Sequence, residues 1–341
     1  MMDPLAATTS RRRFIGAGLG FVALAVTACG DDDAPSKGAP TGAVPTDGTF
    51  PVTVTHVHGQ TTIESPPERV VSYGYTDGDT VLALGTVPVG ILQWIPQWRR
   101  GVGPWSEPAL GSGRPTLYKG QEIDFEGIAK ATPDLISIVN HDIDDATYEK
   151  LSQIAPTVPT VEGYPAYGTP WDVTAIQVAT ALGKKTQGAA LVAKAEERFA
   201  QAREANPGWK GKQVMIVTQA EGGKMFVFAD TDTRGRFVSS LGFVQSPEIS
   251  KLTGKSFYAE LSAERFDLLD GDGLILLADS TAVQGALEEQ PTWQRLEVVR
   301  EGRVVTVEDL QLSMALSAST PTSIPYALDR LVPQLQKTLP A

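Results

Sequence analysis

One long uninterrupted helical segment in the middle of the chain constrains the fold most strongly. Residues 186–206 contain no proline and a single glycine, Gly188, before Pro207 and Gly208 end the segment. A helix of this length extends for roughly 30 Å at 1.5 Å per residue. Alternating strand and helix patterns precede and follow it, so we expect it to join two α/β lobes. A single rigid helix also resists a large hinge motion, so we expect a ligand to change the angle between the lobes only slightly.

Short apolar runs with the length of buried strands alternate with helical patterns on both sides of this segment. Before it, strands are expected at 51–58, 69–73, 88–92, 135–139 and 158–161, and helices at 77–84, 125–131, 148–154 and 171–182. After it, strands are expected at 214–217, 225–228, 274–277 and 304–307, and helices at 236–241, 263–269, 293–298 and 322–335. This alternation predicts βαβ units around largely parallel sheets. The predicted fold class is α/β, with two Rossmann-like lobes and a ligand cleft between them.

The N-terminal residues carry the three parts of a bacterial export signal. Residues 10–15 read SRRRFI, a twin-arginine sequence, and an apolar stretch rich in Gly and Ala runs from Phe14 to Ala28. A basic segment, a short apolar segment and small residues before the cleavage point define such a signal. The stretch is short for a membrane span, which needs roughly 20 apolar residues. We therefore expect residues 1–28 to be a twin-arginine signal peptide, with an uncleaved anchor as the alternative, and export in a folded state.

Cys29 is the only cysteine of the chain, so no intramolecular disulfide can form. Its place directly after the apolar stretch resembles the lipobox of bacterial lipoproteins, in which the cysteine is lipidated and becomes the first residue of the mature protein. A buried apolar side chain or a reactive thiol are the alternatives. Two or more acyl chains would give stable attachment, here to the outer face of the bacterial cell membrane. Residues 29–49, rich in Asp, Pro, Gly and Thr, are expected to form a flexible tether.

The remaining chain has the length of two domains and an acidic composition. We expect an N-terminal lobe at 50–183, an interlobe helix at 184–208 and a C-terminal lobe at 209–341. The formal net charge is −11, and the first 28 residues carry a net charge of +2, so the mature protein would carry −13. Such an acidic surface argues against nucleic acid as a partner and against general binding to anionic lipid.

Several motifs, in the same order along the chain, resemble the substrate-binding proteins of ABC importers for iron-siderophores, haem and cobalamin. They are PERVV at 67–71, Asp77 to Gly85, VPVG at 87–90, DFEGIAKATPDLI at 124–136, Leu151 to Thr157, SAERFDLL at 262–269, PTWQRL at 291–296 and GRV at 302–304. The resemblance begins at Pro51 and covers almost all of the chain that follows. It implies two lobes joined by one rigid helix, and a monomeric binding protein that delivers a ferric siderophore to a permease and its ATPase. It implies no resident cofactor, and haem or cobalamin are alternative ligands.

Aromatic and polar side chains follow the expected strands, at the carboxyl ends where open α/β sheets bind ligands. The candidate ligand-binding residues are Tyr73, Tyr75, Trp94, Trp98, Arg99, Asn140, Tyr164, Trp171 and Arg234. Aromatic faces cover the apolar surface of a bulky chelate at low entropic cost, and arginine offers fixed donors to its oxygens. The alternative is that these aromatic residues pack the loops onto the lobes. The sequence does not indicate which siderophore binds.

The three histidines do not predict a metal site. His56 and His58 are two positions apart in an expected edge strand, so both would lie on one solvated face. Direct capture of a metal ion needs more ligands than these. His141 is a candidate for contact with an iron chelate or haem.

Glu126 and Glu264 are candidate contacts with the permease. In the resembled family, a glutamate on the outer surface of each lobe docks into arginine pockets of the permease, and these two residues lie in matching motifs. The alternative is that each stabilises the N-terminus of a short helix.

An exported enzyme and a surface lipoprotein with a scaffolding role are the rival functions. The sequence contains no Gly-x-Ser-x-Gly, no His-Glu-x-x-His and no cysteine that could serve as a nucleophile within the lobes. Its carboxylate cluster at Asp142, Asp144 and Asp145 is expected to open a helix. The scaffolding alternative stays open, because a fold does not determine a function.

Overall fold

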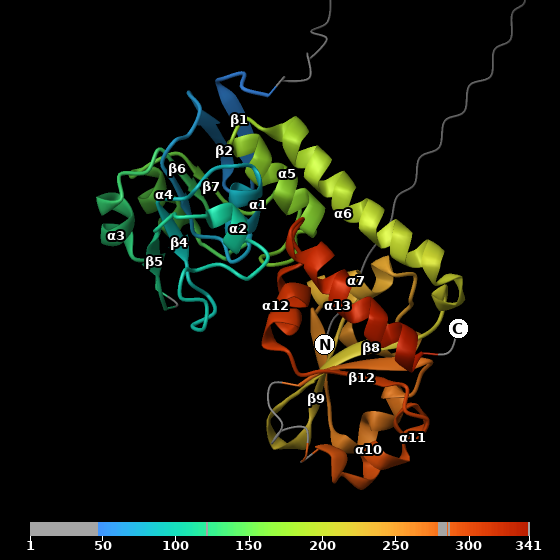
Figure 1. The fold of residues 1–341 in the computed structure, drawn as a ribbon. Helices are drawn as coiled ribbons and strands as arrows, with labels where there is room; N and C mark the ends of the chain where they lie inside the picture. The colour runs from blue at the N-terminus through green and yellow to red at the C-terminus, as the bar shows by residue number, and fades with distance from the viewer. Residues whose placement is uncertain (1–46, 121, 279–284, 286, 340–341) are drawn as a thin grey trace, which may run out of the picture. The chain divides into compact units, whose positions relative to one another are not determined.

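The computed structural model describes residues 47–120, 122–278, 285 and 287–339 (Figure 1). The expected signal peptide at 1–28, the expected lipidation site at Cys29 and the expected tether up to residue 46 lie outside the described residues. From Pro45 onward the chain forms one unit by its internal contacts, and both lobes belong to it.

The first lobe is built on a five-stranded parallel sheet. Its strands are β3 (Val70–Ser72), β4 (Gly90–Leu92), β5 (Thr116–Tyr118), β6 (Leu135–Ser137) and β7 (Thr157–Val158), in the spatial order β5-β4-β3-β6-β7. Strands β3, β4 and β6 are buried along their whole length. Parallel strands that are covered on both faces have continuous apolar sequences, and for this reason these strands could be predicted from the sequence.

Five helices accompany this sheet: α1 (Asp77–Ala83), α2 (Glu107–Leu110), α3 (Phe125–Lys130), α4 (Asp145–Ser152) and α5 (Trp171–Ala181). The expected role of the carboxylate cluster is confirmed, because Asp144 Oδ1 accepts a hydrogen bond from the backbone N–H of Thr147, 2.8 Å away, and caps α4. Asp124 caps α3 in the same way through Gly127. Helices α3 and α4 thus begin where an aspartate side chain accepts from an otherwise unpaired backbone N–H group.

An antiparallel hairpin, β1 (Val52–His56) and β2 (Gly59–Ile63), precedes the sheet. The expectation that His56 and His58 share a solvated strand face is wrong. The face that carries Val54 and His56 is the buried face of the hairpin, and His56 Nε2 lies 2.9 Å from Thr61 Oγ1. His58 lies in the turn after β1, where its ring stacks on Tyr148 with the centroids 5.0 Å apart.

The second lobe is built on a mixed sheet with the spatial order β10-β9-β8-β11-β12. Its strands are β8 (Val214–Gln219), β9 (Met225–Phe228), β10 (Tyr258–Leu261), β11 (Gly273–Leu277) and β12 (Val304–Val307). Strands β8, β11 and β12 are parallel, whereas β9 pairs antiparallel with β8 and β10. Only residues 220–224 connect β8 to β9, too few for the dozen or more that a parallel crossover requires. This short connection explains why β9 departs from the parallel pattern.

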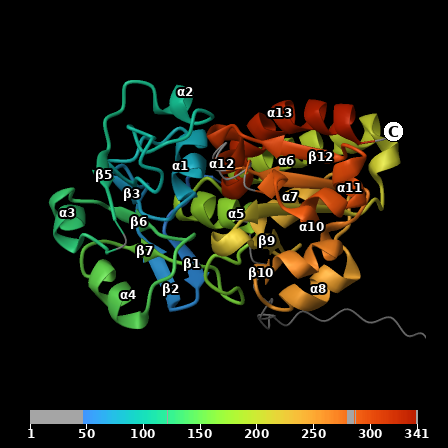
Figure 2. The ribbon, with the colours of Figure 1, turned by 90° about the horizontal axis from the view of Figure 1, so that it is seen from below.

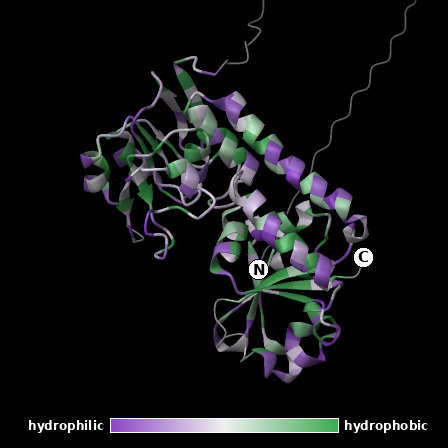
Figure 3. Cartoon of the chain, viewed as in Figure 1, coloured by the Kyte–Doolittle hydropathy of each residue, from purple (hydrophilic) through white to green (hydrophobic). Residues whose placement is uncertain are grey.

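The helices of the second lobe are α7 (Thr233–Ser240), α8 (Pro247–Thr253), α10 (Pro291–Arg295), α11 (Glu297–Arg300), α12 (Leu310–Ala318) and α13 (Ser323–Thr338), seen from another side in Figure 2. The described part of this lobe also contains the short 3₁₀ segments η1 (Pro207–Trp209), η2 (Glu221–Gly223) and η3 (Ala263–Leu269). Apolar residues concentrate in the strands, while α13 alternates between polar and apolar residues (Figure 3). Its buried residues, among them Ile324, Ala327, Leu328 and Leu331, recur at helical spacing.

Helix α6 (Lys185–Ala205) corresponds to the long helix expected from the sequence and packs on both lobes. Near its start, Leu191 joins the apolar cluster of the first lobe that contains Val178 and Leu182. Farther along, Ala195 and Phe199 join the core of the second lobe. The predicted fold class, two α/β lobes joined by one long helix, is therefore confirmed.

In the part of the chain that the structure describes, no helix is both long enough and apolar enough to span a membrane.

Candidate ligand-binding site

A cavity of about 460 Å³ lies between the two lobes and takes its walls from both. Residues that line it are Tyr75, Thr76, Trp94, Asn140, Tyr167, Asp232, Thr233, Arg234, Phe257, Tyr258, Met314 and Ser317. Ligand pockets in proteins have volumes of about 300–1,000 Å³ and are lined mainly by apolar and aromatic side chains with a few polar groups. Both the size and the lining of this cavity are typical of a small-molecule site.

The parallel sheet explains where the first-lobe wall lies. Tyr75 follows β3, Trp94 follows β4 and Asn140 follows β6, so all three come from carboxyl ends of neighbouring strands. Such ends meet at one edge of a parallel sheet, which is the edge where α/β proteins bind ligands. The second lobe contributes the start of α7, the start of β10 and the middle of α12.

Tyr75 is the centre of an aromatic wall. Its ring meets Trp94 and Tyr167 edge-on, with centroid distances of 6.1 and 5.8 Å, and it stacks on His141 at 5.3 Å. Edge-to-face and offset contacts of this kind hold aromatic rings in place. His141 is buried and lies outside the lining of the cavity, with Nδ1 2.9 Å from the carbonyl oxygen of Asp142. The rings therefore form a fixed apolar surface on one side of the cavity.

Tyr167 has an unusual backbone. Its φ angle is +60°, in the left-handed region, and its side chain lies at the cavity with 44% of the residue exposed. A residue with a Cβ atom in this region costs roughly 1–2 kcal/mol. Strain of this kind concentrates at sites that bind ligands. A strained, exposed aromatic residue at the cavity points to a contact with a ligand rather than to core packing.

Arg234 is held rigidly on the opposite wall. Its Nε and Nη2 atoms donate to Asp232 Oδ1 and Oδ2, at 2.7 and 2.8 Å. Its guanidinium group also lies 3.6 Å above the centre of the Phe228 ring. Nη1 has no hydrogen-bond partner among the residues that the structure describes. The bidentate ion pair with Asp232 and the stacking on Phe228 fix the plane of the guanidinium group. The edge that carries Nη1 is left free to donate a hydrogen bond.

A buried carboxylate positions the loop that carries Asn140. Asp77 accepts hydrogen bonds from Ser137 Oγ at 2.6 Å and from the backbone N–H groups of Val139 and Asn140 at 2.7 and 3.0 Å. Burial raises the pKa of Asp77, and these hydrogen bonds oppose that rise. The Asn140 Nδ2 atom in turn donates to Thr76 Oγ1 at 2.7 Å. Asp77 thus fixes two cavity-lining residues without touching the cavity itself.

Four of the nine candidate ligand-binding residues line the cavity: Tyr75, Trp94, Asn140 and Arg234. Trp98 lies behind Trp94, with the ring centroids 5.1 Å apart, and its Nε1 donates to Gln311 Oε1 of α12 at 2.8 Å. It therefore joins the two lobes instead of lining the cavity. Tyr73 is buried in the core of the first lobe against Tyr118, because it directly follows the buried strand β3 and points to its inner side.

Arg99, Tyr164 and Trp171 also lie outside the cavity lining. Arg99 is exposed, and Tyr164 is half-buried in the loop after β7. Trp171 is the first residue of α5 and packs against the core of the second lobe. Arg99 and Tyr164 come from loops whose course the strand pattern did not determine.

Eight lining residues were not among the candidates: Thr76, Tyr167, Asp232, Thr233, Phe257, Tyr258, Met314 and Ser317. Phe257 and Tyr258 are adjacent aromatic residues in the sequence, which could have indicated a binding surface, but no strand was expected there. Met314 and Ser317 lie on α12, which was not expected either. The sequence therefore indicated the first-lobe wall better than the second-lobe wall.

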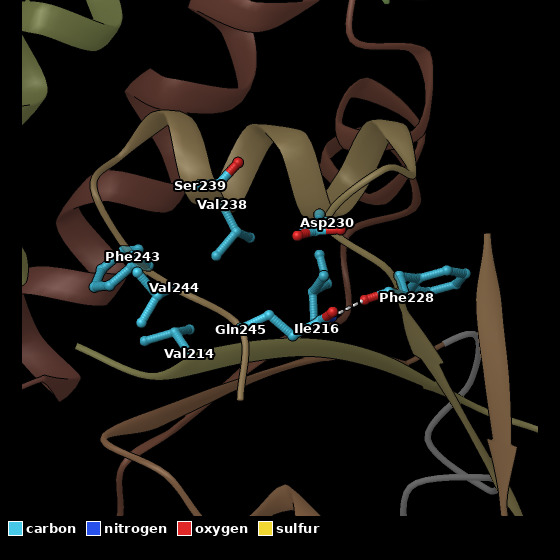
Figure 4. A pocket seen from close by; sticks show the side chains of 10 residues that line it. Val214, Ile216, Phe228, Asp230, Val238, Ser239, Phe243, Val244 and Gln245 are labelled. Atoms are coloured by element: carbon cyan, nitrogen blue, oxygen red, sulfur yellow. Dashed lines mark hydrogen bonds between the residues drawn. The ribbon is translucent and has the colours of Figure 1, made fainter. Parts of the chain in front are cut away.

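A much smaller void lies within the second lobe beneath α7 (Figure 4). Apolar side chains such as Val214, Ile216 and Val238 line it, and its volume is about 10 Å³. That is about the space of one water molecule. Beside it, Gln245 Nε2 donates to the carbonyl oxygen of Phe228 at 2.6 Å. The void is a feature of packing and is too small for a substrate.

Metal-binding side chains do not gather in the described part of the chain, where no group of three or more His, Cys, Asp or Glu residues could hold an ion. Glu126 and Glu264 lie outside the cavity lining. Each is exposed and occupies the first turn of a short helical segment, Glu126 in α3 and Glu264 in η3. A hydrogen bond with the Ser262 side chain lowers the pKa of Glu264.

Comparison with known sequences identifies a protein family that matches this chain. The family described as periplasmic binding protein matches residues 70–309, which is more than half of the chain. The ferric enterobactin-binding periplasmic protein of Escherichia coli O6:H1 is 25% identical over 273 residues, covering 75% of this chain and 83% of the relative. The Fe(3+) dicitrate-binding periplasmic protein of Escherichia coli K12 is 27% identical over 268 residues, covering 76% of this chain and 83% of the relative.

Solved structures of other proteins superpose on this chain over most of their length and of its own. A periplasmic solute binding protein from Mycobacterium smegmatis superposes with a TM-score of 0.76 and 31% identity, covering 85% of this chain and 99% of that one. PiaA from Streptococcus pneumoniae, solved in complex with ferrichrome, superposes with a TM-score of 0.73 and 26% identity, covering 84% of this chain and 98% of that one. Together with the two lobes and the single connecting helix, these matches show that the chain belongs to the periplasmic binding protein family, in its class III arrangement.

Proposed function

We propose that this protein is the substrate-binding lipoprotein of an ABC importer and that it captures a ferric siderophore in the cavity between its lobes. The observation that carries the proposal is the pairing of an aromatic wall, centred on Tyr75, with a rigidly held guanidinium group, that of Arg234. Named relatives of the chain bind ferric enterobactin and ferric dicitrate, which supports a ferric chelate as the ligand.

The proposed binding mode uses the two walls differently. The rings of Tyr75, Trp94 and Tyr167 would cover the hydrocarbon surface of the chelate, where burial of apolar area stabilises the complex by about 25 cal/mol per Å². Arg234 would donate from its free Nη1 edge to an oxygen that ligates the iron. Because the protein offers no cluster of metal ligands among its described residues, the iron would enter already chelated.

Delivery requires contact with a permease. Glu126 on the first lobe and Glu264 on the second are exposed and lie at the starts of short helical segments, as the proposed docking role requires. Attachment would come from the lipidated Cys29 after twin-arginine export, with residues 29–49 as the tether. A monomer with one exposed glutamate on each lobe would be sufficient for docking.

Titration of intrinsic tryptophan fluorescence tests this function. The purified protein is titrated with ferric hydroxamates, ferric catecholates, ferric citrate, haem and cobalamin, and the Trp94→Ala variant is titrated in parallel. We expect saturable quenching by at least one ferric chelate and a dissociation constant about tenfold or more higher in Trp94→Ala. Leu252→Ala, which truncates an exposed apolar residue of α8, serves as the matched control and should bind like the wild type.

The panel also separates the alternatives. Saturation by haem or cobalamin alone would contradict a siderophore as the ligand while leaving a transport function. Saturation by none of the compounds would contradict the receptor function and favour the scaffolding alternative.

A further inference from the structure

The charges that line the cavity cancel one another. Of the described residues that line it, only Asp232 and Arg234 carry a formal charge. They bind each other through two hydrogen bonds of 2.7 and 2.8 Å, and the Asp232 side chain is almost completely buried. An ion pair with this geometry contributes a fixed donor edge but no net charge. The cavity therefore presents Arg234 as a hydrogen-bond donor more than as a positive charge.

Arg236 is a further cation near the cavity, but carboxylates surround it. Arg236, two residues after Arg234 in α7, donates from Nη2 to the carbonyl oxygen of Gly168 at 3.2 Å. Burial lowers the pKa of Arg236, while three nearby carboxylates, those of Asp172, Asp232 and Asp230, oppose that fall. On the first-lobe wall, burial raises the pKa of Tyr167, and the negative charge of Asp142 contributes to that rise. The charged groups described around the cavity thus carry no net positive charge.

Ferric chelates differ in net charge according to their ligating groups. Three catecholates carry six negative charges, so their ferric complex is triply negative, whereas three hydroxamates carry three and give a neutral complex. A buried anion needs several cations or charge-assisted donors to offset its lost hydration. A neutral complex needs only hydrogen-bond donors for its oxygens and apolar surface for its linkers, and Arg234 and the wall around Tyr75 provide these.

A single positive charge on the chelate also suits this cavity. Tyr75, Trp94, Tyr167 and Tyr258 present aromatic rings at the lining, and the faces of such rings attract an ammonium group. No lining cation other than the already paired Arg234 would repel it, among the residues that the structure describes.

We infer that the cavity selects ferric tris-hydroxamates, neutral or with one ammonium group, over triply negative ferric tris-catecholates. The inference rests on the proposed function and narrows it to one class of chelate. The Asp232–Arg234 pair determines this preference for hydroxamates, because the negative charge of Asp232 offsets the positive charge of Arg234 that an anionic chelate would need.

Competitive titration measures this selectivity directly. Tryptophan fluorescence of the purified protein is followed with three probes: a neutral ferric tris-hydroxamate, a ferric tris-hydroxamate with one free ammonium group, and a ferric tris-catecholate. We expect both hydroxamates to bind at least about tenfold more tightly than the catecholate at physiological salt. The dissociation constant of the neutral probe should change little with salt, because no ionic contact is made.

A substitution at the ion pair tests the cause. Asp232→Asn leaves the positive charge of Arg234 unopposed while keeping a side chain that can cap α7. It should tighten catecholate binding by about tenfold and change binding of the neutral hydroxamate much less. Asp267→Asn, at an exposed position in η3 outside the lining, removes the same charge and should leave both dissociation constants unchanged.

The outcomes distinguish this inference from the proposed function. Catecholate binding as tight as hydroxamate binding would overturn the selectivity and leave the receptor for ferric chelates standing. An unchanged selectivity in Asp232→Asn would overturn the role of the ion pair. Failure of all three probes to bind would overturn the inference, whereas the proposed function is contradicted only if ferric citrate also fails to bind.

Discussion

Thr320 Oγ1 of the second lobe donates a hydrogen bond to Asp79 Oδ2 of the first lobe across 2.8 Å. Asp79 is buried in α1 and also accepts from Trp105 Nε1 and Ser106 Oγ, each 2.6 Å away. Three donors converge on one carboxylate, and one of them comes from the other lobe. Leaving a buried carboxyl group without one of its hydrogen-bond partners costs roughly 1–3 kcal/mol. This contact is therefore a strong link between the lobes.

We expect Thr320→Val to lower the free energy of unfolding by about 1–3 kcal/mol, because it leaves the buried carboxylate of Asp79 short of one donor. Urea unfolding measures the change. Thr320→Ser keeps the hydroxyl group and should retain most of the stability. Thr116→Val, on the exposed face of β5, is the control, and a loss in Thr320→Val no larger than in this control would contradict the role of the contact.

Aromatic contacts make a second link between the lobes. Trp94 of the cavity contacts Trp98, Trp98 contacts Trp105 and Trp105 contacts Tyr326 of α13, with centroid distances of 5.1, 5.3 and 5.5 Å. The hydrogen bond from Trp98 to Gln311 crosses the same boundary. With these links and the helix α6 in place, we expect the lobes to rotate little relative to each other.

We therefore expect small-angle scattering profiles with and without a saturating ferric chelate to be nearly the same. The physical reason is that a large closure would break the contacts of Trp98 and Asp79, at a cost of several kcal/mol. A Trp98→Phe variant lacks the hydrogen bond to Gln311 and should show a larger change on binding. A marked contraction of the wild type would show that the links do not limit closure.

The sequence was most informative where the chain is buried and regular. Strands such as β3 and β6 have continuous apolar sequences because both of their faces are covered. The long helix α6 was predictable because nothing interrupts residues 186–206. Strands β5 and β10 were missed, since each lies at the edge of its sheet with exposed residues and lacks an apolar run.

The site was predictable only in part, and for a physical reason. Residues after the carboxyl ends of the parallel strands could be placed near the cleft, which located Tyr75, Trp94 and Asn140. Which side chains of a long loop point outward depends on tertiary packing, so Trp98 could not be recognised as an interlobe contact. The histidines were misplaced because the alternation of β1 does not tell which of its faces is covered.

Acidification should destabilise the protein through His56. Burial, and to a lesser extent the nearby His58, lowers the pKa of His56 to about 4 from an ordinary value of 6.5. Its Nε2 lies 2.9 Å from Thr61 Oγ1, and its Nδ1 accepts the backbone N–H of His58 at 3.3 Å, so the neutral ring uses both nitrogens. Between these pH values the unfolded chain binds more protons, so this stability is complete above the ordinary pKa and is lost as the pH falls toward 4.

We expect the free energy of unfolding attributable to His56 to fall by about 2 kcal/mol between pH 7 and pH 4.5. Urea unfolding at both pH values measures it, with His56→Gln as the comparison. The variant should have a lower free energy of unfolding at pH 7, but this free energy should fall less on acidification than it does in the wild type. Equal losses in the wild type and the variant would contradict a role for His56.

Docking of the permease makes a separate prediction. The double variant Glu126→Ala with Glu264→Ala should bind a ferric chelate as the wild type does, because both residues lie outside the cavity lining. Uptake of labelled iron by cells that carry the importer should fall. The double variant Glu196→Ala with Glu248→Ala, which removes exposed glutamates from α6 and α8, is the control. Normal uptake with both pairs would exclude the docking role.

The central claim, that the cavity between the lobes holds one ferric chelate, is tested most directly by the iron content of the protein. Purified protein is incubated with a neutral ferric tris-hydroxamate, freed of excess chelate by gel filtration and analysed for iron. The account predicts a single iron atom per wild-type chain and loss of most of it in Trp94→Ala, whose side chain lines the cavity. Equal iron in the two proteins, or none in the wild type, would contradict it.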